Sequence, residues 1–247
     1  MNKTIFMALL GLFAGNQSFS QGLNISADLG YGMSAGSQVI GVNIGPQSEE
    51  NVVGSFGQGV SAGINLNYMF NSNLGVDLGL GVLMGKEYEV TYKEETIDEM
   101  MKLKGSMFRI MPGVRLSMGE EKSLIPFGRF GLVIGVGAKL IMEDTYTENF
   151  LYYNHEYELS QGTALGWFGA FGLGYKINDK VRFNAELLMI NQSWAPGKLE
   201  NTVNSDGELQ PDIDLVDELN GSSARKRLTT RLPFGSIGLN AGIQMNF

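Results

Sequence analysis

The only histidine of the chain lies in the segment YYNHEYELS, residues 152–160. His155, Glu156, Glu158 and Ser160 supply the residue types that general acid–base and acyl-transfer chemistry require. The segment falls between two predicted strands, and no pair of the form H-x-S lies on a strand. A single histidine is also a weak basis for a metal site. We therefore expect a polar loop histidine, and no catalytic, cofactor-binding or metal-binding residues.

A second candidate for ion binding is the acidic segment DGELQPDIDLVDEL, residues 206–219. It lacks the ligand spacing and the glycine of an EF-hand calcium loop. Acidic runs of this kind are usually solvated surface, so a weak divalent-cation contact is the alternative. The basic segment ARKR, residues 224–227, follows closely and could pair with these acids or with lipid phosphates.

A third group of ionisable side chains lies within segments that alternate apolar residues with Gly, Asn and Ser. Its members are Asp28, Asp77, Arg109, Arg115, Arg129, Lys139, Arg182 and Glu186. All lie on the small-residue register. If that register lines a narrow interior, the charges must be paired, because burying an isolated charge is very unfavourable. We predict a structural ion-pair network, with Asp77 and Arg115 at similar height on neighbouring strands. A ring of charges that selects ions is the alternative.

Apolar residues recur with period two in the segments that carry these charges, and this pattern predicts β-strands. Eight such segments follow one another, at about 23–33, 59–70, 74–85, 107–118, 124–141, 163–177, 181–194 and 236–247. Three connections are tight turns rich in Asn, Asp, Gly and Ser, at 71–73, 119–123 and 178–180. The other four are long, at about 34–58, 86–106, 142–162 and 195–233.

The composition of the small-residue register indicates which face of these strands points to the inside of the barrel. A soluble barrel would carry Lys, Glu and Thr on its outer face, whereas Gly, Asn and Ser suit the interior of a narrow membrane barrel. A secreted, lipocalin-like barrel is the alternative. Aromatic residues near the strand ends predict interfacial girdles. One girdle would contain Tyr68, Phe70, Tyr175 and Phe247, and the other Tyr31, Phe56, Trp167, Trp194 and Phe234.

The N-terminus has the layout of a secretory signal peptide. Lys3 precedes an apolar run from Ile5 to about Ala14, which is too short to span a bilayer as a helix. We predict a signal peptide over residues 1–20 and one barrel domain over 21–247. The formal net charge is −8 and cysteine is absent. A basic nucleic-acid-binding surface and any thiol chemistry are therefore excluded.

With its signal peptide, alternating strands, alternating turn lengths and terminal GIQMNF, the chain resembles the small outer-membrane β-barrel proteins of Gram-negative bacteria, the OmpA/OmpX-like group. The resemblance implies an all-β, eight-stranded antiparallel up-and-down transmembrane barrel with three short periplasmic turns and four long extracellular loops. Ile243, Met245 and Phe247 resemble the C-terminal signal that the barrel-assembly machinery reads. Outer-membrane lipid and lipopolysaccharide are the other implied partners.

These features favour a non-enzymatic outer-membrane protein with a structural or surface-interaction role and a lumen plugged by side chains. An unidentified protein or surface ligand would bind at the extracellular loops. Three alternatives remain: a narrow solute or ion pore, an accessory of a secretion or surface-assembly machine, and a lipid A-modifying enzyme that uses His155.

Overall fold

In a computed structural model of the chain, the regular secondary structure of the described residues is all β. None of these residues forms a helix long and apolar enough to cross a membrane. The expected signal peptide, residues 1–20, lies outside the described residues. The structure describes residues 22–35, 38–93, 97–118, 123–148, 151–204, 212–216 and 226–247.

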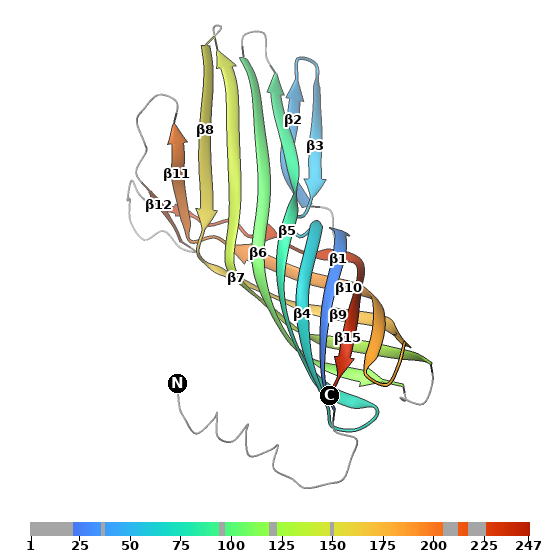
Figure 1. The fold of residues 1–247 in the computed structure, drawn as a ribbon. Helices are drawn as coiled ribbons and strands as arrows, with labels where there is room; N and C mark the ends of the chain where they lie inside the picture. Colours follow the sequence, from blue (N-terminus) through green and yellow to red (C-terminus); the bar gives the residue numbers. More distant parts are fainter. Residues whose placement is uncertain are drawn as a thin grey trace.

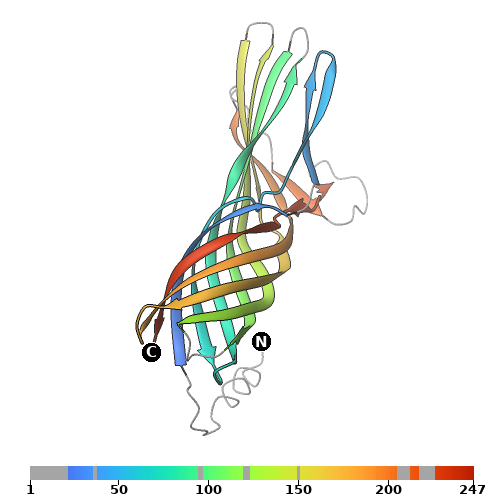
Figure 2. The same ribbon diagram turned by 90° about the vertical axis from the view of Figure 1, so that its right-hand side faces the viewer.

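Eight strands form a closed ring in which every neighbouring pair is antiparallel (Figures 1 and 2). The ring closes because the last strand pairs with the first over the full register from Asn24↔Asn246 to Ser34↔Ser236. This confirms the predicted eight-stranded barrel. In ring order the strands are β1 (Gly22–Ser34), β4 (Gly59–Met69), β5 (Leu74–Lys93), β6 (Ile97–Ser117), β7 (Leu124–Glu148), β9 (Thr163–Lys176), β10 (Val181–Ala195) and β15 (Ser236–Asn246).

Much of what the sequence predicts as long loops is in fact strand. β5, β6 and β7 run on past the ring and form an upright sheet at one end of it (Figure 1). We call this the loop-end sheet, and the opposite end of the ring the turn end. The loop-end sheet is extended by β8 (Leu151–Ser160), which pairs with β7, and by β11 (Lys198–Asn204), which pairs with β8. Shorter strands complete the structure: β2 (Gln38–Gly45), β3 (Ser48–Gly54), β12 (Ile213–Val216), β13 (Lys226–Leu228) and β14 (Leu232–Pro233).

Two of the turn-end hairpins are built alike. The side-chain Oδ1 of Asn71 accepts hydrogen bonds from the backbone N–H groups of Asn73 and Leu74, both at 2.9 Å. Asn178 does the same for Lys180 and Val181, also at 2.9 Å. An Asn side chain that bonds the backbone two residues on makes an Asx-turn. The two hairpins therefore use the same local chemistry to reverse the chain.

The apolar register of the ring faces outward. Leu29, Phe130 and Leu239 are 66%, 64% and 69% exposed, whereas the inward-facing Val133 and Phe168 are fully buried. A water-soluble barrel would show the reverse arrangement. The outer face of the ring is therefore suited to hydrocarbon, as in transmembrane barrels.

Lys139 is not in the interior, and its prediction is wrong. Ser106 pairs with Lys139 but Phe108 pairs with Val136, so β7 carries one extra residue, next to Gly137. A one-residue shift moves every following side chain to the other face of a strand. Ala138 and Leu140 are consequently buried, while the Lys139 side chain is 53% exposed and its Nζ lies 2.7 Å from Glu158 Oε1.

A second bulge lies at the same level on β5. There Met84 pairs with Ser106 and Glu87 with Lys104, which again leaves one extra residue. The two bulges flank Ser106 of β6 on either side and mark the boundary between the ring and the loop-end sheet.

Gly137 tests the importance of the β7 bulge. Its φ of +61° lies in the left-handed region, and a Cβ added there would meet nothing within 4 Å. A Gly137→Ala substitution should therefore destabilise the protein through backbone strain alone, by about 1–2 kcal/mol. Gly169→Ala is the matched control, because its Cβ would also meet nothing within 4 Å and its φ is not left-handed. Urea unfolding in lipid vesicles would measure both. If the two variants were equally stable, the left-handed backbone of Gly137 would not require glycine, which would contradict this prediction.

Candidate functional site

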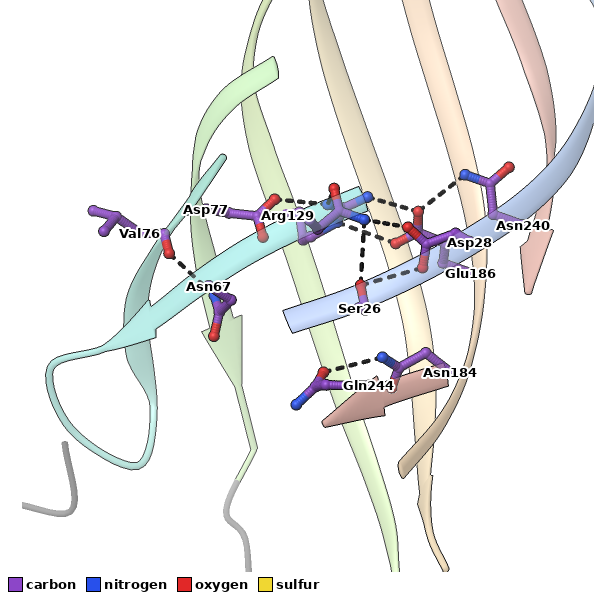
Figure 3. A network of polar contacts seen from close by, with 11 residues as sticks. Ser26, Asp28, Asn67, Val76, Asp77, Arg129, Asn184, Glu186, Asn240 and Gln244 are labelled. Carbon is purple, nitrogen blue, oxygen red and sulfur yellow. Dashed lines mark hydrogen bonds and ion pairs between the residues drawn. The ribbon is translucent and has the colours of Figure 1, made fainter. Parts of the chain in front are cut away.

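The barrel interior is organised around the buried guanidinium of Arg129 on β7. Its Nη1 lies 2.6 Å from Asp77 Oδ2, and its Nη2 lies 2.6 Å from Glu186 Oε1. Nε adds a second bond to Glu186, at 3.1 Å to Oε2, so this pair is bidentate. All three residues are less than 10% exposed. Arg129 therefore joins three strands, β5, β7 and β10, across the interior (Figure 3).

Neutral amides extend this ion-pair group towards Asp28 on β1. Asn65 accepts a hydrogen bond from Arg129 Nη1 at 2.9 Å through its Oδ1 and donates through Nδ2 to Asp28 Oδ2. Ser26 Oγ lies 3.3 Å from the other Asp28 oxygen, and Asn240 Nδ2 donates to Glu186 Oε1 at 3.2 Å. The interior network thus has members on β1, β4, β5, β7, β10 and β15 and crosses the ring interior.

The predicted members do not form one ion-pair network. Arg115 pairs in register with Gly75, and the carboxylate of Asp77 bonds Arg129 instead. The Arg115 guanidinium lies 4.0 Å from the centre of the Phe127 ring, a cation–π contact. Arg182 is 7% exposed near the turn end. Arg109 lies closer to the loop end, where Nε donates to Gln192 Oε1 at 3.0 Å and Nη2 donates to the backbone oxygen of Phe234 at 2.8 Å.

Sequence reasoning missed the amide side chains that complete this interior. Asn24 donates to Asn67 at 3.3 Å and Asn184 to Gln244 at 3.0 Å, each between neighbouring strands. The sequence did contain a signal for these amides, because they lie on the same register as the predicted charged residues. Buried polar groups need hydrogen-bond partners, so a polar residue on that register had to have one.

Four aromatic side chains pack together at the loop end of the ring, and we call them the aromatic cap: Phe56, Tyr88, Trp194 and Phe234. The Phe234 ring lies 5.8 Å from those of Phe56 and Trp194, and Phe56 lies 6.0 Å from Tyr88, centre to centre. Phe56, Trp194 and Phe234 are 0–2% exposed. They were predicted to belong to an interfacial girdle, and that prediction is wrong.

The inward position of these three aromatic residues has a backbone cause. Trp194 occupies the inward register of β10, with Gln192 and Ile190. The connections that carry Phe56 and Phe234 fold back across the ring end, where Phe56 N donates to Pro233 O and Phe234 N to Gln192 O, both at 2.9 Å. The other girdle residues that are exposed face outward: Tyr31, Trp167, Tyr175 and Phe247.

Three small cavities lie along the interior between the cap and the turn end, with volumes of about 40, 20 and 10 Å³. Arg109 lines the first two, and Arg129 lines the first and the third. A cavity needs about 10–15 Å³ to hold one water molecule. These spaces therefore fit a few waters or a small ion.

His155 lies on strand β8 and not in a loop, contrary to the prediction. It pairs in register with Asp144, contacts the Tyr146 ring at 5.5 Å, and its Nδ1 lies 3.4 Å from Tyr157 Oη. Glu156, Glu158 and Ser160 alternate with His155 along the strand and so lie on the opposite face. The His, Ser and acid groups are therefore not assembled as a catalytic site.

Asp144 and Glu99 share the face of the loop-end sheet that carries His155. Burial raises the pKa of Asp144, and the nearby His155 opposes that shift. Burial also raises the pKa of Glu99, with a further contribution from the negative charge of Asp144.

The predicted acidic segment is described only in part. Asp212 is exposed, as expected of a solvated acidic surface, and its Oδ2 lies 2.7 Å from Nζ of Lys198, which is not part of the basic segment at 224–227. Residues 205–211 and 217–225 lie outside the described part of the chain. Among the residues that the structure describes, no group of three or more His, Asp or Glu is placed to hold a metal ion. Ile243, Met245 and Phe247 are 51%, 54% and 73% exposed on the outer face of β15.

Arg129 provides a direct test of the interior ion pairs. Arg129→Met should lower the free energy of unfolding by about 3–5 kcal/mol, because it leaves Asp77 and Glu186 buried without a counter-charge. Adding Asp77→Asn and Glu186→Gln to that variant should restore much of the loss. Lys139→Met, which breaks only the pair of an exposed lysine, should leave the stability nearly unchanged. Urea unfolding in vesicles measures all of these, and equal effects at positions 129 and 139 would rule out a special role for the buried group.

Asp144 should make the loop-end sheet more stable in mild acid. Because its pKa is raised on folding, the folded sheet binds a proton more tightly than the unfolded chain. Stability should therefore rise as the pH falls through the raised pKa, and the gain should be complete below the ordinary pKa of an aspartate. Asp144→Asn should remove this rise and increase amide protection of β7 and β8 at pH 7, as measured by hydrogen exchange. Glu143→Gln, on the exposed face of the same strand, is the control and should retain the pH dependence. The same pH dependence in the Asp144→Asn variant would contradict this account.

Comparison with solved structures finds similar β proteins at low identity. Neisserial surface protein A is 12% identical with a TM-score of 0.42, and 91% of this chain and 97% of that one are covered. A major outer membrane protein from Thermus thermophilus is 11% identical with a TM-score of 0.48, covering 92% and 100%. The attachment invasion locus protein Ail of Yersinia pestis is 11% identical with a TM-score of 0.30, covering 92% and 97%. No curated protein sequence matches this chain.

The family is shown by the sequence itself. The family model described as "Outer membrane protein beta-barrel domain" matches residues 4–205. Strand β15, which closes the ring, lies beyond this match and is identified by its pairing with β1 and β10. The match agrees with the outward apolar register and implies a location in the outer membrane. The chain belongs to the outer membrane protein beta-barrel domain family.

Proposed function

We propose that this protein is an integral outer-membrane barrel that does not conduct solutes and that acts through its loop-end sheet, in a structural or surface-interaction role. The turn end would face the periplasm and the loop-end sheet the cell exterior. The barrel-assembly machinery would recognise Ile243, Met245 and Phe247, and outer-membrane lipid with lipopolysaccharide would surround the ring.

The observation that supports the proposal is that buried side chains lie across the interior at two levels. The aromatic cap crosses the loop end, and the Arg129–Asp77–Glu186 group crosses the middle of the ring. The interior cavities, of about 40, 20 and 10 Å³, are small, and Arg129 lines the first and the third of them. An eight-stranded barrel leaves an interior just wide enough for side chains, so such groups are sufficient to fill it.

The loop-end sheet supports a role in surface interaction. Its outward extension is built from paired strands, and its charged face is ordered by ion pairs between neighbouring strands. Lys139 lies 2.7 Å from Glu158, Lys93 lies 3.5 Å from Asp98, and Lys102 lies 3.8 Å from Glu87. Each exposed pair contributes little stability. A surface held in one conformation by strand pairing nonetheless loses less entropy when a partner binds.

Reconstitution tests the two parts of the proposal separately. In planar bilayers the purified protein should give no stable, reproducible channel, because buried side chains obstruct the aqueous path. Detergent extraction of the native protein, followed by affinity capture, should recover a partner or surface ligand with the intact chain. A variant in which a two-residue turn replaces residues 141–158 should not recover it. That segment is chosen because Leu140 and Leu159 already pair in register.

Two results would overturn the proposal. A reproducible open channel from the wild-type protein would show a pore. Capture of the same material by the shortened variant, with its barrel still folded by the heat-modifiability assay, would show that the loop-end sheet is not the binding surface.

A further inference from the structure

We propose that a small monovalent anion of the chloride class binds inside the barrel, in the 40 Å³ cavity beside Arg109. The site lies between the Arg129 ion pairs and the aromatic cap. It goes beyond the proposed function, because it concerns the electrostatics of the buried interior residues and not the loop-end sheet.

Arg109 is a buried cation whose hydrogen-bond partners are neutral. It is 4% exposed, and it donates to the Gln192 amide oxygen and to the Phe234 carbonyl oxygen. None of the ion pairs between described residues includes Arg109. A guanidinium has five N–H donors, so these two bonds leave three for another acceptor. Burying a charge without a counter-charge raises the free energy of the folded state, and a bound anion would offset this cost.

The charge balance of the interior makes the same point. Four buried arginines and three carboxylic acids lie on the inward register, which leaves these seven groups with one positive charge in excess when all are ionised. They are Arg109, Arg115, Arg129 and Arg182 against Asp28, Asp77 and Glu186. Lys176, on the same register at the turn end, pairs with Asp179. Asp77 and Glu186 are committed to Arg129 at 2.6 Å. Asp28 accepts hydrogen bonds from Ser26 and Asn65. Arg109 lies next to the cap, where it donates to the backbone oxygen of Phe234.

The cavity has the size and lining for such an anion. Its 40 Å³ exceed the roughly 10–15 Å³ that one water needs, so a chloride and an accompanying water both fit. Arg109, Ser61, Asn65 and Asn240 contribute polar groups to its wall, while Met111, Leu188 and Ile190 contribute apolar ones. The apolar wall lowers the local dielectric constant, which strengthens the attraction between a guanidinium and an anion. Asp28 also lines the cavity. In the alternative to a bound anion, the cavity holds only water, which bridges the Asp28 carboxylate to the Arg109 guanidinium.

Thermal unfolding in different salts tests the proposal. The folded protein in zwitterionic detergent would be heated in sodium chloride, sodium bromide and sodium gluconate at equal ionic strength. At a chloride concentration about ten times its dissociation constant, the midpoint should be about 3–6 °C higher than in gluconate, which is too large for the cavity. The rise should saturate with concentration. Crystals grown in bromide should show an anomalous peak beside Arg109.

Two variants localise the effect. Arg109→Gln should lose the difference between chloride and gluconate, whereas Lys139→Gln, which removes an exposed lysine outside the barrel, should keep it. If Arg109→Gln does not fold, Arg109→Lys replaces it. Arg109→Lys keeps the charge, and the lost guanidinium donors should reduce the chloride effect at least threefold.

Equal midpoints of the wild-type protein in chloride and gluconate, or no bromide peak in the cavity, would show that the cavity holds water alone and would overturn the proposal. An undiminished chloride effect in the position-109 variants would place the anion elsewhere and also overturn it.

Discussion

Backbone amides that face hydrocarbon must find their partners within the protein, and in this molecule the pairing of β15 with β1 meets that requirement. Without this pairing, two strands would expose unpaired N–H and C=O groups to the membrane. Closure also fixes the rest of the architecture. Once the ring has eight strands, its interior is narrow, its outer face is in contact with lipid, and each side chain belongs to one side or the other. The pattern of glycine, amide and charge on the inner register follows from that single constraint.

The narrow interior explains why the charged residues are arranged as they are. Arg129 satisfies two carboxylates and an amide at once, so one guanidinium replaces several separate pairs. Glycines on the inner register leave space for the buried side chains around this group. At Gly172, for example, an added Cβ would lie 2.4 Å from the Phe127 ring and 2.9 Å from Glu186 Cβ. The small residues and the buried ions are therefore two parts of one packing solution.

Beyond the end of the ring, the strands no longer enclose a narrow interior, and the composition of the inward register changes. The bulges on β5 and β7 occur at the level of Ser106, and beyond them the inward register carries Tyr88, Ala138 and Leu140 instead of polar groups. These residues join the aromatic cap in one apolar cluster. The strands then continue as a sheet whose two faces are no longer lipid and lumen. One face carries ion pairs, and the other carries Asp144, His155 and the tyrosines around them.

The sequence by itself determined the number of strands in the ring, the positions of the tight turns at 71–73 and 178–180, and the outward apolar register. These features are local, because a period of two and a turn residue can be read without knowing the partner strand. Asp77, Arg129 and Glu186 could be placed on the inner register for the same reason. Which carboxylate meets which guanidinium depends on strand stagger and side-chain reach, so only the tertiary structure decided that Arg129 and not Arg115 bonds Asp77. Gly137 looks like the many other glycines in the sequence, so the bulge beside it could not be predicted, yet this bulge places Lys139 on the opposite face of β7. The returning connections that bury Phe56 and Phe234 are likewise set by long-range hydrogen bonds, which no local pattern in the sequence encodes.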